Sequence, residues 1–281
     1  MYKIVKKNEI GLRVHSYEIY APEVAKSAKA GQFVILRIDD KGERIPLTIS
    51  GVSCQESLVR IIFQEIGKST SQLALLNEGD YIKDFAGPLG HPAEVKKYGT
   101  VVAVAGGVGA AEVLPIIKGF KKIGNKIVTI LGARNKDLII LEDELKQESD
   151  TLFFVTNDGT YGTKGIVTDV LKDVMDKENI NLVYTIGPIQ MMKSVAELTK
   201  GKCIKTIASL NPIMLDGTGM CGACRVTVDG KIKFACVDGP EFDAHTLQWA
   251  ELVSRQNLFK NLEKISLDNF RCNGNCKCHK N

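Results

Sequence analysis

Three cysteines in a glycine-rich stretch have the residue type and the spacing that metal chemistry requires. Cys221, Cys224 and Cys236 form the pattern C-x2-C-x11-C. The two-residue gap lets one loop present two thiolates to the same centre, and the neighbouring glycines permit the tight turns that such a loop needs. A centre with four protein ligands requires one more residue in addition to these three.

Asp216 is the residue that we expect to complete the set. It stands five positions before Cys221, where the C-x4-C-x2-C pattern of plant-type [2Fe-2S] ferredoxins has a cysteine. A carboxylate is anionic like a thiolate, but its harder oxygen donor changes the reduction potential of the iron. The alternative is a structural zinc ion, which favours cysteine and histidine ligands at shorter spacings. The predicted ligands of a [2Fe-2S] cluster are therefore Asp216, Cys221, Cys224 and Cys236.

A second candidate site is the glycine turn in AVAGGVGAAEVLP, residues 103–115, which joins a buried apolar run to a helical pattern. Backbone N–H groups of such a turn bind phosphate at the helix N-terminus. The standard dinucleotide fingerprint G-x-G-x-x-G is not met, because Glu112 stands where it requires glycine or alanine. We expect Gly106, Gly107 and Gly109 to approach a nucleotide closely.

Two further loops are expected at the same sheet edge. TNDGTYGTKG at residues 156–165 follows the third strand of this region, and GPIQMM at residues 187–192 follows the fourth. Ligands of a parallel sheet bind at the carboxyl ends of its strands, so three loops predict a pocket more firmly than one. Asp158, Gly159 and Gly187 join the candidate nucleotide-binding residues.

The N-terminal third of the chain offers a cradle for a flavin dinucleotide. RIPLTIS at residues 44–50 combines an arginine for phosphate charge, a rigid proline and alternating small hydroxyl residues. GKSTSQLALLNEGD at residues 67–80 adds a glycine and hydroxyl groups ahead of a helical pattern. Its GKST letters do not form a nucleotide triphosphatase motif, which needs glycine where Ile62 stands. The candidates are Arg44, Pro46, Thr48, Ser50, Gly67, Ser69 and Thr70.

The elements that position these residues fall into successive regions. Residues 1–97 contain short strands separated by proline, glycine and charged turns, which predicts an antiparallel β-barrel. In residues 98–210, buried strands alternate with amphipathic helices, which predicts a parallel sheet covered on both faces. Residues 211–268 carry the cysteines and a helix expected from Ala244 into the region of Phe259, and residues 269–281 form a polar tail. The predicted fold class is α/β plus β.

Composition excludes several classes of function. The chain has 37 basic and 33 acidic residues, well interleaved, and a net charge of +4, so it lacks a basic arm for nucleic acid. It has neither a secretion signal nor an apolar run long enough to span a membrane, which predicts a soluble cytoplasmic protein. Its four histidines show no triad spacing, which disfavours a hydrolase.

Together these motifs resemble the flavin-dependent ferredoxin reductase superfamily, through R-x-P-L-T-x-S, GKSTSQL, GPLG at residues 87–90, GGVGAAEVLP and IGP. Within it, DGTGMCGAC is similar to electron-transfer subunits with a C-terminal [2Fe-2S] cluster. One such family is the electron-transfer subunit of dihydroorotate dehydrogenase B, whose cluster has four cysteines. The other is the small subunit of NADH-dependent reduced ferredoxin:NADP+ oxidoreductase, whose cluster uses an aspartate and three cysteines. Asp216 and the segment 237–259 favour the second family.

The resemblance implies an oxidoreductase subunit that passes electrons between NAD(H) or NADP(H), FAD and a [2Fe-2S] cluster. It adds Leu47 to the FAD-binding residues and assigns Gly107, Gly109, Asp158 and Gly187 to the nicotinamide nucleotide. Arg134, just after the second strand of the parallel sheet, could meet a 2′-phosphate. The implied partner is a larger subunit with flavin and iron–sulfur clusters, in a complex that acts on ferredoxin by electron bifurcation.

Two points lie outside that resemblance. A zinc-stabilised nucleotide-binding regulator without redox turnover is the alternative from a different functional class. The tail has no counterpart in the family, and it carries four residues that could bind a further metal: Cys272, Cys276, Cys278 and His279.

Overall fold

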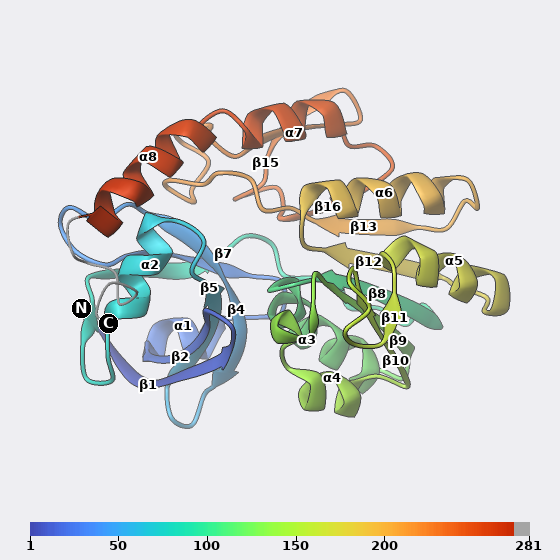
Figure 1. The fold of residues 1–281 in the computed structure, drawn as a ribbon, viewed down its shortest axis with the longest axis horizontal. Coiled ribbons are helices and arrows are strands. Elements are labelled where there is room, and N and C mark those ends of the chain that lie inside the picture. The colour runs from blue at the N-terminus through green and yellow to red at the C-terminus, as the bar shows by residue number, and fades with distance from the viewer. Residues whose placement is uncertain (273–281) are drawn as a thin grey trace.

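The computed structural model describes residues 1–272, and the tail positions Cys276, Cys278 and His279 lie outside them. The chain forms a barrel, a parallel sheet with helices on both faces, and a C-terminal region that lies across both (Figure 1). The predicted fold class is confirmed. Within residues 1–272 we find no helix with the length and apolar composition that a membrane span requires.

The barrel is a seven-stranded antiparallel sheet in the order β6-β1-β2-β5-β4-β3-β7. The two strands at the ends of this order are separated in the sequence by Lys83 alone, so the sheet is nearly closed. Its core is aromatic and aliphatic, with Tyr17 and Phe63 in edge-to-face contact at 5.1 Å. The elements are β1 Tyr2–Gly11, β2 Val14–Tyr20, α1 Pro22–Ser27, β3 Phe33–Arg37, β4 Ile45–Ser53, β5 Leu58–Gln64, α2 Lys68–Leu75, β6 Tyr81–Ile82 and β7 Asp84–Leu89.

Strand β4 has one face toward the barrel core and one face away from it. Ile45, Leu47 and Ile49 pack in the core, because successive side chains of a strand alternate between its faces. Pro46 and Thr48 therefore share the outer face. This face is where the other two regions meet the barrel.

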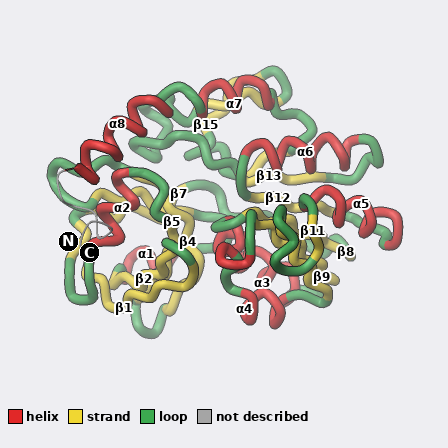
Figure 2. The backbone as a smooth tube through the Cα atoms, viewed as in Figure 1, coloured by secondary structure: helices red, strands yellow, loops and turns green. Residues whose placement is uncertain are grey.

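The second sheet has the order β11-β10-β9-β8-β12-β13-β16, and its strands are parallel except β16. Helices α3 and α4 cover one face, and α5 and α6 cover the other (Figures 1 and 2). The elements are β8 Thr100–Gly106, α3 Gly109–Lys122, β9 Lys126–Ala133, the 3-10 helix η1 Lys136–Leu138, α4 Glu142–Glu148, β10 Thr151–Thr156, β11 Thr163–Lys164, α5 Val167–Lys177, β12 Leu182–Ile186, α6 Ile189–Lys200, β13 Thr206–Ser209 and β16 Glu241–Asp243.

The C-terminal region begins with an irregular segment; its residues 215–224 contain Cys221 and Cys224, and we refer to them as the cysteine loop. A two-stranded hairpin and two helices follow. The first helix packs against α6, and the second reaches across to contact α2 of the barrel (Figure 1). The elements are β14 Arg225–Val228, β15 Lys231–Phe234, α7 Trp249–Gln256 and α8 Lys260–Phe270.

The helix predicted from Ala244 into the region of Phe259 is wrong at both ends. Residues 241–243 form β16, which pairs antiparallel with β13. The chain then turns, with the Asp243 carboxylate accepting the His245 N–H at 2.9 Å, and α7 begins only at Trp249. A second helix, α8, follows Phe259 and extends into the predicted tail.

Candidate functional site

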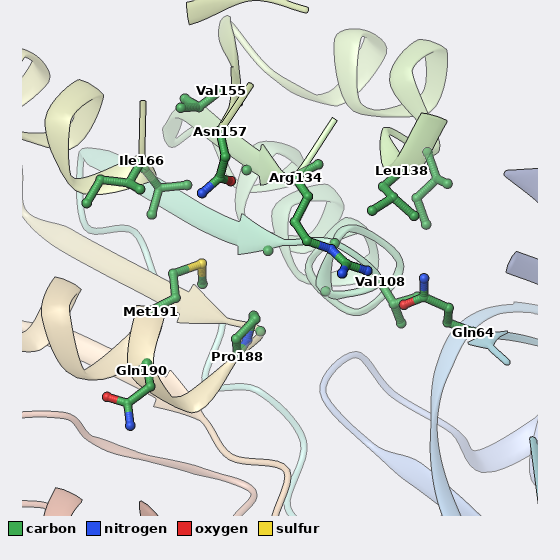
Figure 3. A pocket seen from close by; sticks show the side chains of 18 of the residues that line it. Gln64, Val108, Arg134, Leu138, Val155, Asn157, Ile166, Pro188, Gln190 and Met191 are labelled. Carbon is green, nitrogen blue, oxygen red and sulfur yellow. The ribbon is translucent and has the colours of Figure 1, made fainter. Parts of the chain in front are cut away.

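A cavity of about 670 Å³ lies where the carboxyl ends of the parallel strands face the barrel. Arg134 and Asn157 point into it from the sheet, and Gln64 reaches it from the barrel side (Figure 3). Its walls include four of the predicted nucleotide-binding glycines: Gly106, Gly107, Gly109 and Gly187. We refer to this space as the nucleotide cavity.

The glycine turn gives this cavity an anion-binding wall. Gly109 begins α3 directly against β12, and a Cβ at this position would lie 2.7 Å from the Ile186 carbonyl oxygen. A Cβ at Gly107 would meet no atom within 4 Å, so open space lies beside that backbone. The N-terminus of a helix carries a partial positive charge and free N–H groups. The turn is therefore suited to a dinucleotide pyrophosphate.

Asp158 and Gly159 are not among the residues that line the nucleotide cavity. The Asp158 carboxylate accepts hydrogen bonds from the Thr160 N–H at 3.0 Å and the Thr160 hydroxyl at 2.7 Å, and these bonds lower its pKa. Asn157, one residue earlier, lies at the cavity instead. The loop lies at the expected sheet edge, but Asn157 lines the cavity in place of the predicted Asp158 and Gly159.

A second cavity, of about 810 Å³, lies between the outer face of β4, the cysteine loop and helices α7 and α8. Arg44 and Pro46 line it from the barrel, and Cys221 lines it from the cysteine loop. Asn211 lines both this cavity and the nucleotide cavity. We refer to the second space as the flavin cavity, because it contains the strand predicted to hold FAD.

None of the other predicted flavin residues lines the flavin cavity. Gly67 and the start of α2 are held by the Thr70 hydroxyl, which accepts the Gly67 N–H at 3.1 Å, and Ser69 donates to Glu43 at 2.5 Å. A Cβ at Gly67 would meet no atom within 4 Å, so a ligand could approach this turn.

Ser50 and Leu47 lie elsewhere. Ser50 is buried and donates its hydroxyl to the Arg60 carbonyl at 3.0 Å, and the Leu47 side chain packs toward the barrel core. The structure brings neither side chain to the flavin cavity.

The four predicted cluster ligands form two pairs, with Cys236 supplied by the segment after β15. The Cys224 and Cys236 sulfur atoms are 3.2 Å apart and buried. The Asp216 carboxylate accepts the Cys221 N–H at 2.8 Å and the Thr218 N–H at 2.9 Å, which lowers the pKa of Asp216. The pattern of one thiol pair and one carboxylate–cysteine pair suits a centre with two metal ions.

The side chains of the four predicted cluster ligands do not converge on one point. In the part of the chain that is described, no three histidine, cysteine, aspartate or glutamate side chains are grouped closely enough to hold a single metal ion. Cys221 is exposed, whereas Cys224 is buried, although they are three residues apart. Cys272, in the predicted tail, is also exposed.

The barrel positions the cysteine loop. Gly217 lies against β3 and β7, where a Cβ would come within 2.6 Å of Leu89 and 2.9 Å of Ile35, and its φ of +77° also favours glycine. No larger residue fits there without displacing one of these side chains. The loop is therefore held against the barrel face that carries Pro46 and Thr48.

Sequence reasoning missed two partly buried glutamates with raised pKa values. Burial raises the pKa of Glu112, on the first turn of α3, to about 7, although a hydrogen bond with Thr48 opposes the shift. Burial raises the pKa of Glu241 to about 7, although a 2.7 Å hydrogen bond from the Tyr184 hydroxyl opposes it. In the sequence, Glu112 stands out only as a departure from the dinucleotide fingerprint, and no local pattern indicates that either side chain is partly buried.

Comparisons with known proteins identify the family of the chain. Residues 211–248 match the family described as the iron-sulfur cluster binding domain of dihydroorotate dehydrogenase B. The chain is 48% identical to a homologue of the dihydroorotate dehydrogenase B (NAD(+)) electron transfer subunit from Thermotoga maritima, over 95% of each chain.

Solved structures extend the likeness. A chain of the NADH-dependent reduced ferredoxin-NADP oxidoreductase, studied for flavin-based electron bifurcation, is 46% identical, with a TM-score of 0.91 over 96% of this chain and 98% of that one. Phthalate dioxygenase reductase shares the fold at 17% identity, with a TM-score of 0.60 over 81% of this chain and 85% of that one. This chain belongs to the family of dihydroorotate dehydrogenase B electron-transfer subunits and their homologues.

Proposed function

We propose that this chain is the electron-transfer subunit of an NADH-dependent reduced ferredoxin–NADP oxidoreductase, a cytoplasmic complex that bifurcates electrons. It binds FAD, a [2Fe-2S] cluster and NAD(H). The proposal is supported by the 46% identity to a chain of such an enzyme over nearly the full length. Residues 1–97 bind FAD, residues 98–210 bind the nucleotide, and residues 211–268 carry the cluster.

One observation carries the proposal: Cys221 lines the same cavity as Arg44 and Pro46. A predicted cluster ligand and two predicted flavin-binding residues thus share one space. Asn211 connects that space to the nucleotide cavity. The order of the sites is nucleotide, flavin, cluster, which is the order in which electrons pass between them.

Each group of residues is assigned to the cofactor nearest to it. The Gly107 and Gly109 turn binds the nucleotide phosphates, and Asn157 and Arg134 contact the rest of the nucleotide. Arg44 offsets the phosphate charge of FAD, because guanidinium groups bind phosphate in a bidentate way. Cys224 with Cys236 holds one iron, and Asp216 with Cys221 holds the other.

FAD supplies the exchange between a two-electron hydride carrier and a cluster that accepts one electron at a time. The chain's own residues supply position and electrostatics, since the redox chemistry belongs to the cofactors. The outer face of β4 orients the flavin, and the docked cysteine loop keeps the cluster beside it. The partner is a larger subunit with flavin and iron–sulfur clusters, through which ferredoxin exchanges electrons with the complex.

A second candidate is the electron-transfer subunit of dihydroorotate dehydrogenase B. It is favoured by the domain match at residues 211–248 and by the name of the Thermotoga maritima relative's family. Asp216 separates the two candidates, because a four-cysteine cluster would require a thiolate at that position.

Anaerobic purification of the tagged chain from its native host tests these assignments. We expect a coloured complex with a larger flavin and iron–sulfur subunit, and iron and FAD in the ratio that one cluster and one flavin require. Co-purification of a dihydroorotate-oxidising subunit would instead favour the second candidate. A colourless protein that contains zinc would overturn both and favour a nucleotide-binding regulator.

A further inference from the structure

A contact beside the nucleotide cavity joins the barrel to the parallel sheet. Val14 and Ile62 of the barrel lie in the same hydrophobic core as Ile140, which precedes α4. Val14 and Ile140 also line the nucleotide cavity, so this contact forms one of its walls. We refer to the contact as the seam, and it consists of residues 10–14 and 60–64 of the barrel and residues 137–145 of the sheet region.

An ion pair crosses the seam. Arg60 of β5 donates from Nη1 and Nη2 to the two carboxylate oxygens of Glu144 on α4, each at 3.0 Å. A two-bond fork of this kind fixes the orientation of its partners as well as their distance. The Arg60 and Glu144 side chains are 24% and 34% exposed, so solvent screens their attraction in part. The pair therefore matters more for geometry than for stability.

On the barrel side, Arg60 is fixed to the strand predicted to hold the flavin. Strand β5 pairs with β4, and Gly51 of β4 lies opposite Arg60 in the register. The Arg60 carbonyl also accepts the buried Ser50 hydroxyl of β4 at 3.0 Å. Because β4 lines the flavin cavity through Pro46, the position of Arg60 is tied to that of the proposed flavin.

On the sheet side, Glu144 is fixed to the helix that begins at the glycine turn. The Lys118 ammonium of α3 lies 4.0 Å from the Glu144 carboxylate. Lys121 of the same helix donates to the Gln147 carbonyl of α4 at 2.8 Å. Helix α3 begins at Gly109, in the wall of the nucleotide cavity. A continuous series of contacts thus connects the flavin strand, through the ion pair, with the nucleotide turn.

Hydride transfer depends on how these two regions meet. The proposed nucleotide and flavin are held by different regions, so the distance between their reacting atoms is set at the seam. Reacting atoms must approach to about 3–3.5 Å, and a misplacement of about 1 Å can cost roughly 100-fold in rate. Neither Arg60 nor Glu144 lines either cavity. Any effect of this pair on the reaction must therefore come through the positions of the regions that it joins.

We propose that Arg60 and Glu144 are a positioning pair for hydride transfer, which holds the nucleotide-binding region at the distance from the flavin strand that the reaction needs. NADH loses a hydride and becomes NAD+, the flavin gains that hydride, and the pair itself exchanges no proton or electron. This inference rests on the proposed function, because it needs NADH and a flavin in adjacent sites.

The test compares Arg60→Met, Glu144→Gln and the double variant with Arg37→Met in the intact complex. Arg37 of β3 pairs with Asp84 of β7 at 2.6 Å, and these side chains are similarly exposed, at 26% and 39%. This control pair lies wholly within the barrel, so its loss should not change how the barrel meets the sheet. Anaerobic stopped-flow absorbance then follows reduction of the flavin over a range of NADH concentrations, which separates the limiting rate from the dissociation constant. NADH deuterated at the transferred position identifies the phase that is limited by the hydride step.

We expect Arg60→Met and Glu144→Gln each to slow the limiting rate of hydride transfer by about 10-fold, as a displacement of less than 1 Å would. The double variant should be no slower than either single variant, because both replacements remove the same contact. The dissociation constant for NADH should stay within about twofold of the native value, since the residues of the nucleotide cavity are unchanged. Arg37→Met should keep the native rate.

A readout independent of turnover and of the cofactors completes the test. Amide hydrogen exchange of α4 should be faster in the full chain with Arg60→Met than in the native chain, and unchanged in Arg37→Met, because only the first replacement loosens the seam. The flavin content of the native protein is measured as well. Absence of flavin would count against the proposed function alone, since exchange at the seam is still measurable.

Three results would overturn the inference: a native limiting rate in both Arg60→Met and Glu144→Gln, effects that multiply in the double variant, or equal slowing by Arg37→Met. If Arg60→Met does not fold, Arg60→Lys decides the question by the same criteria. It keeps the positive charge but loses the two-bond fork, so it should still slow hydride transfer.

Discussion

The nucleotide cavity and the cysteine loop are built in opposite ways. The cavity is formed where strands end and α3 begins, so its glycines are held by a sheet of seven hydrogen-bonded strands. The loop at residues 215–224 has no helix or strand, and the contacts of Asp216 are with backbone groups of the same loop. The cavity is therefore shaped by secondary structure, whereas the loop is shaped by hydrogen bonds within itself. Binding and stability should therefore respond differently to mutation in the two regions.

The largest effect should come from removing a thiol of the buried pair. Cys236→Ser should abolish iron binding and electron transfer, because each iron of the centre needs both of its protein ligands. NADH affinity should stay within about twofold, because the nucleotide cavity is built separately. Iron analysis and an NADH titration measure the two quantities. Cys203→Ser, at an exposed cysteine, is the matched control and should retain all of its iron. Loss of NADH binding in Cys236→Ser would mean that the two regions fold as one unit.

The converse change should damage the cavity and spare the loop. Gly109→Ala places a methyl group 2.7 Å from the Ile186 carbonyl oxygen, so α3 must move away from β12. We expect the dissociation constant for NADH to rise about 10-fold, equivalent to about 1.4 kcal/mol, while iron content is unchanged. Gly201→Ala is the control, since its nearest contact is a relaxed 3.7 Å. Native affinity in Gly109→Ala would show that the glycine turn does not bind the nucleotide.

The raised pKa of Glu112 should make the stability of the fold sensitive to pH. The pKa of Glu112 rises from 4.5 to about 7 in the folded state, so the folded chain binds more protons than the unfolded chain between these values. The stabilisation is complete below pH 4.5 and is lost as the pH rises through about 7. Glu112→Gln should therefore be more stable than the native protein above pH 7, by about 1–3 kcal/mol, with little difference at pH 4.5. Urea unfolding at both pH values measures this, with Glu9→Gln as an exposed control. A constant offset at both pH values would contradict the assignment.

The smallest effect concerns the identity of one cluster ligand. Asp216→Cys replaces a hard oxygen donor by a thiolate, and it should lower the reduction potential of the cluster without loss of iron. The shift should be on the order of tens of millivolts, as for other changes in the immediate surroundings of a cluster. Potentiometric titration followed by electron paramagnetic resonance measures it. If Asp216→Ala left the potential and the iron content unchanged, Asp216 would not be a ligand.

The sequence was most informative where spacing alone carries the chemistry. The cysteine pattern, the glycine turn and the alternation of strands and helices all depend on neighbours in the chain, and the predicted elements of both sheets are present. Arg44 and Pro46 could be proposed for the same reason, because one strand places them together.

The features that sequence could not predict depend on contacts between distant segments. Glu112 is partly buried because α3 packs on β4, more than fifty residues earlier in the chain, and this contact leaves no local pattern. The short strand β16 forms because it pairs with β13, more than thirty residues earlier in the chain. The turn after β16 delays the helix predicted from Ala244, and α7 begins only at Trp249. Asn157 lines the nucleotide cavity and Asp158 does not, because of the way the loop turns after β10. The glycine-rich sequence of this loop does not determine that turn.

Gly217 packs against Ile35 and Leu89 and so holds the cysteine loop against the barrel. Electron tunnelling weakens steeply as the gap between donor and acceptor widens. If FAD binds at β4 as proposed, the flavin and the cluster would both be held by the barrel, so the gap between them would be set there and not at the nucleotide cavity.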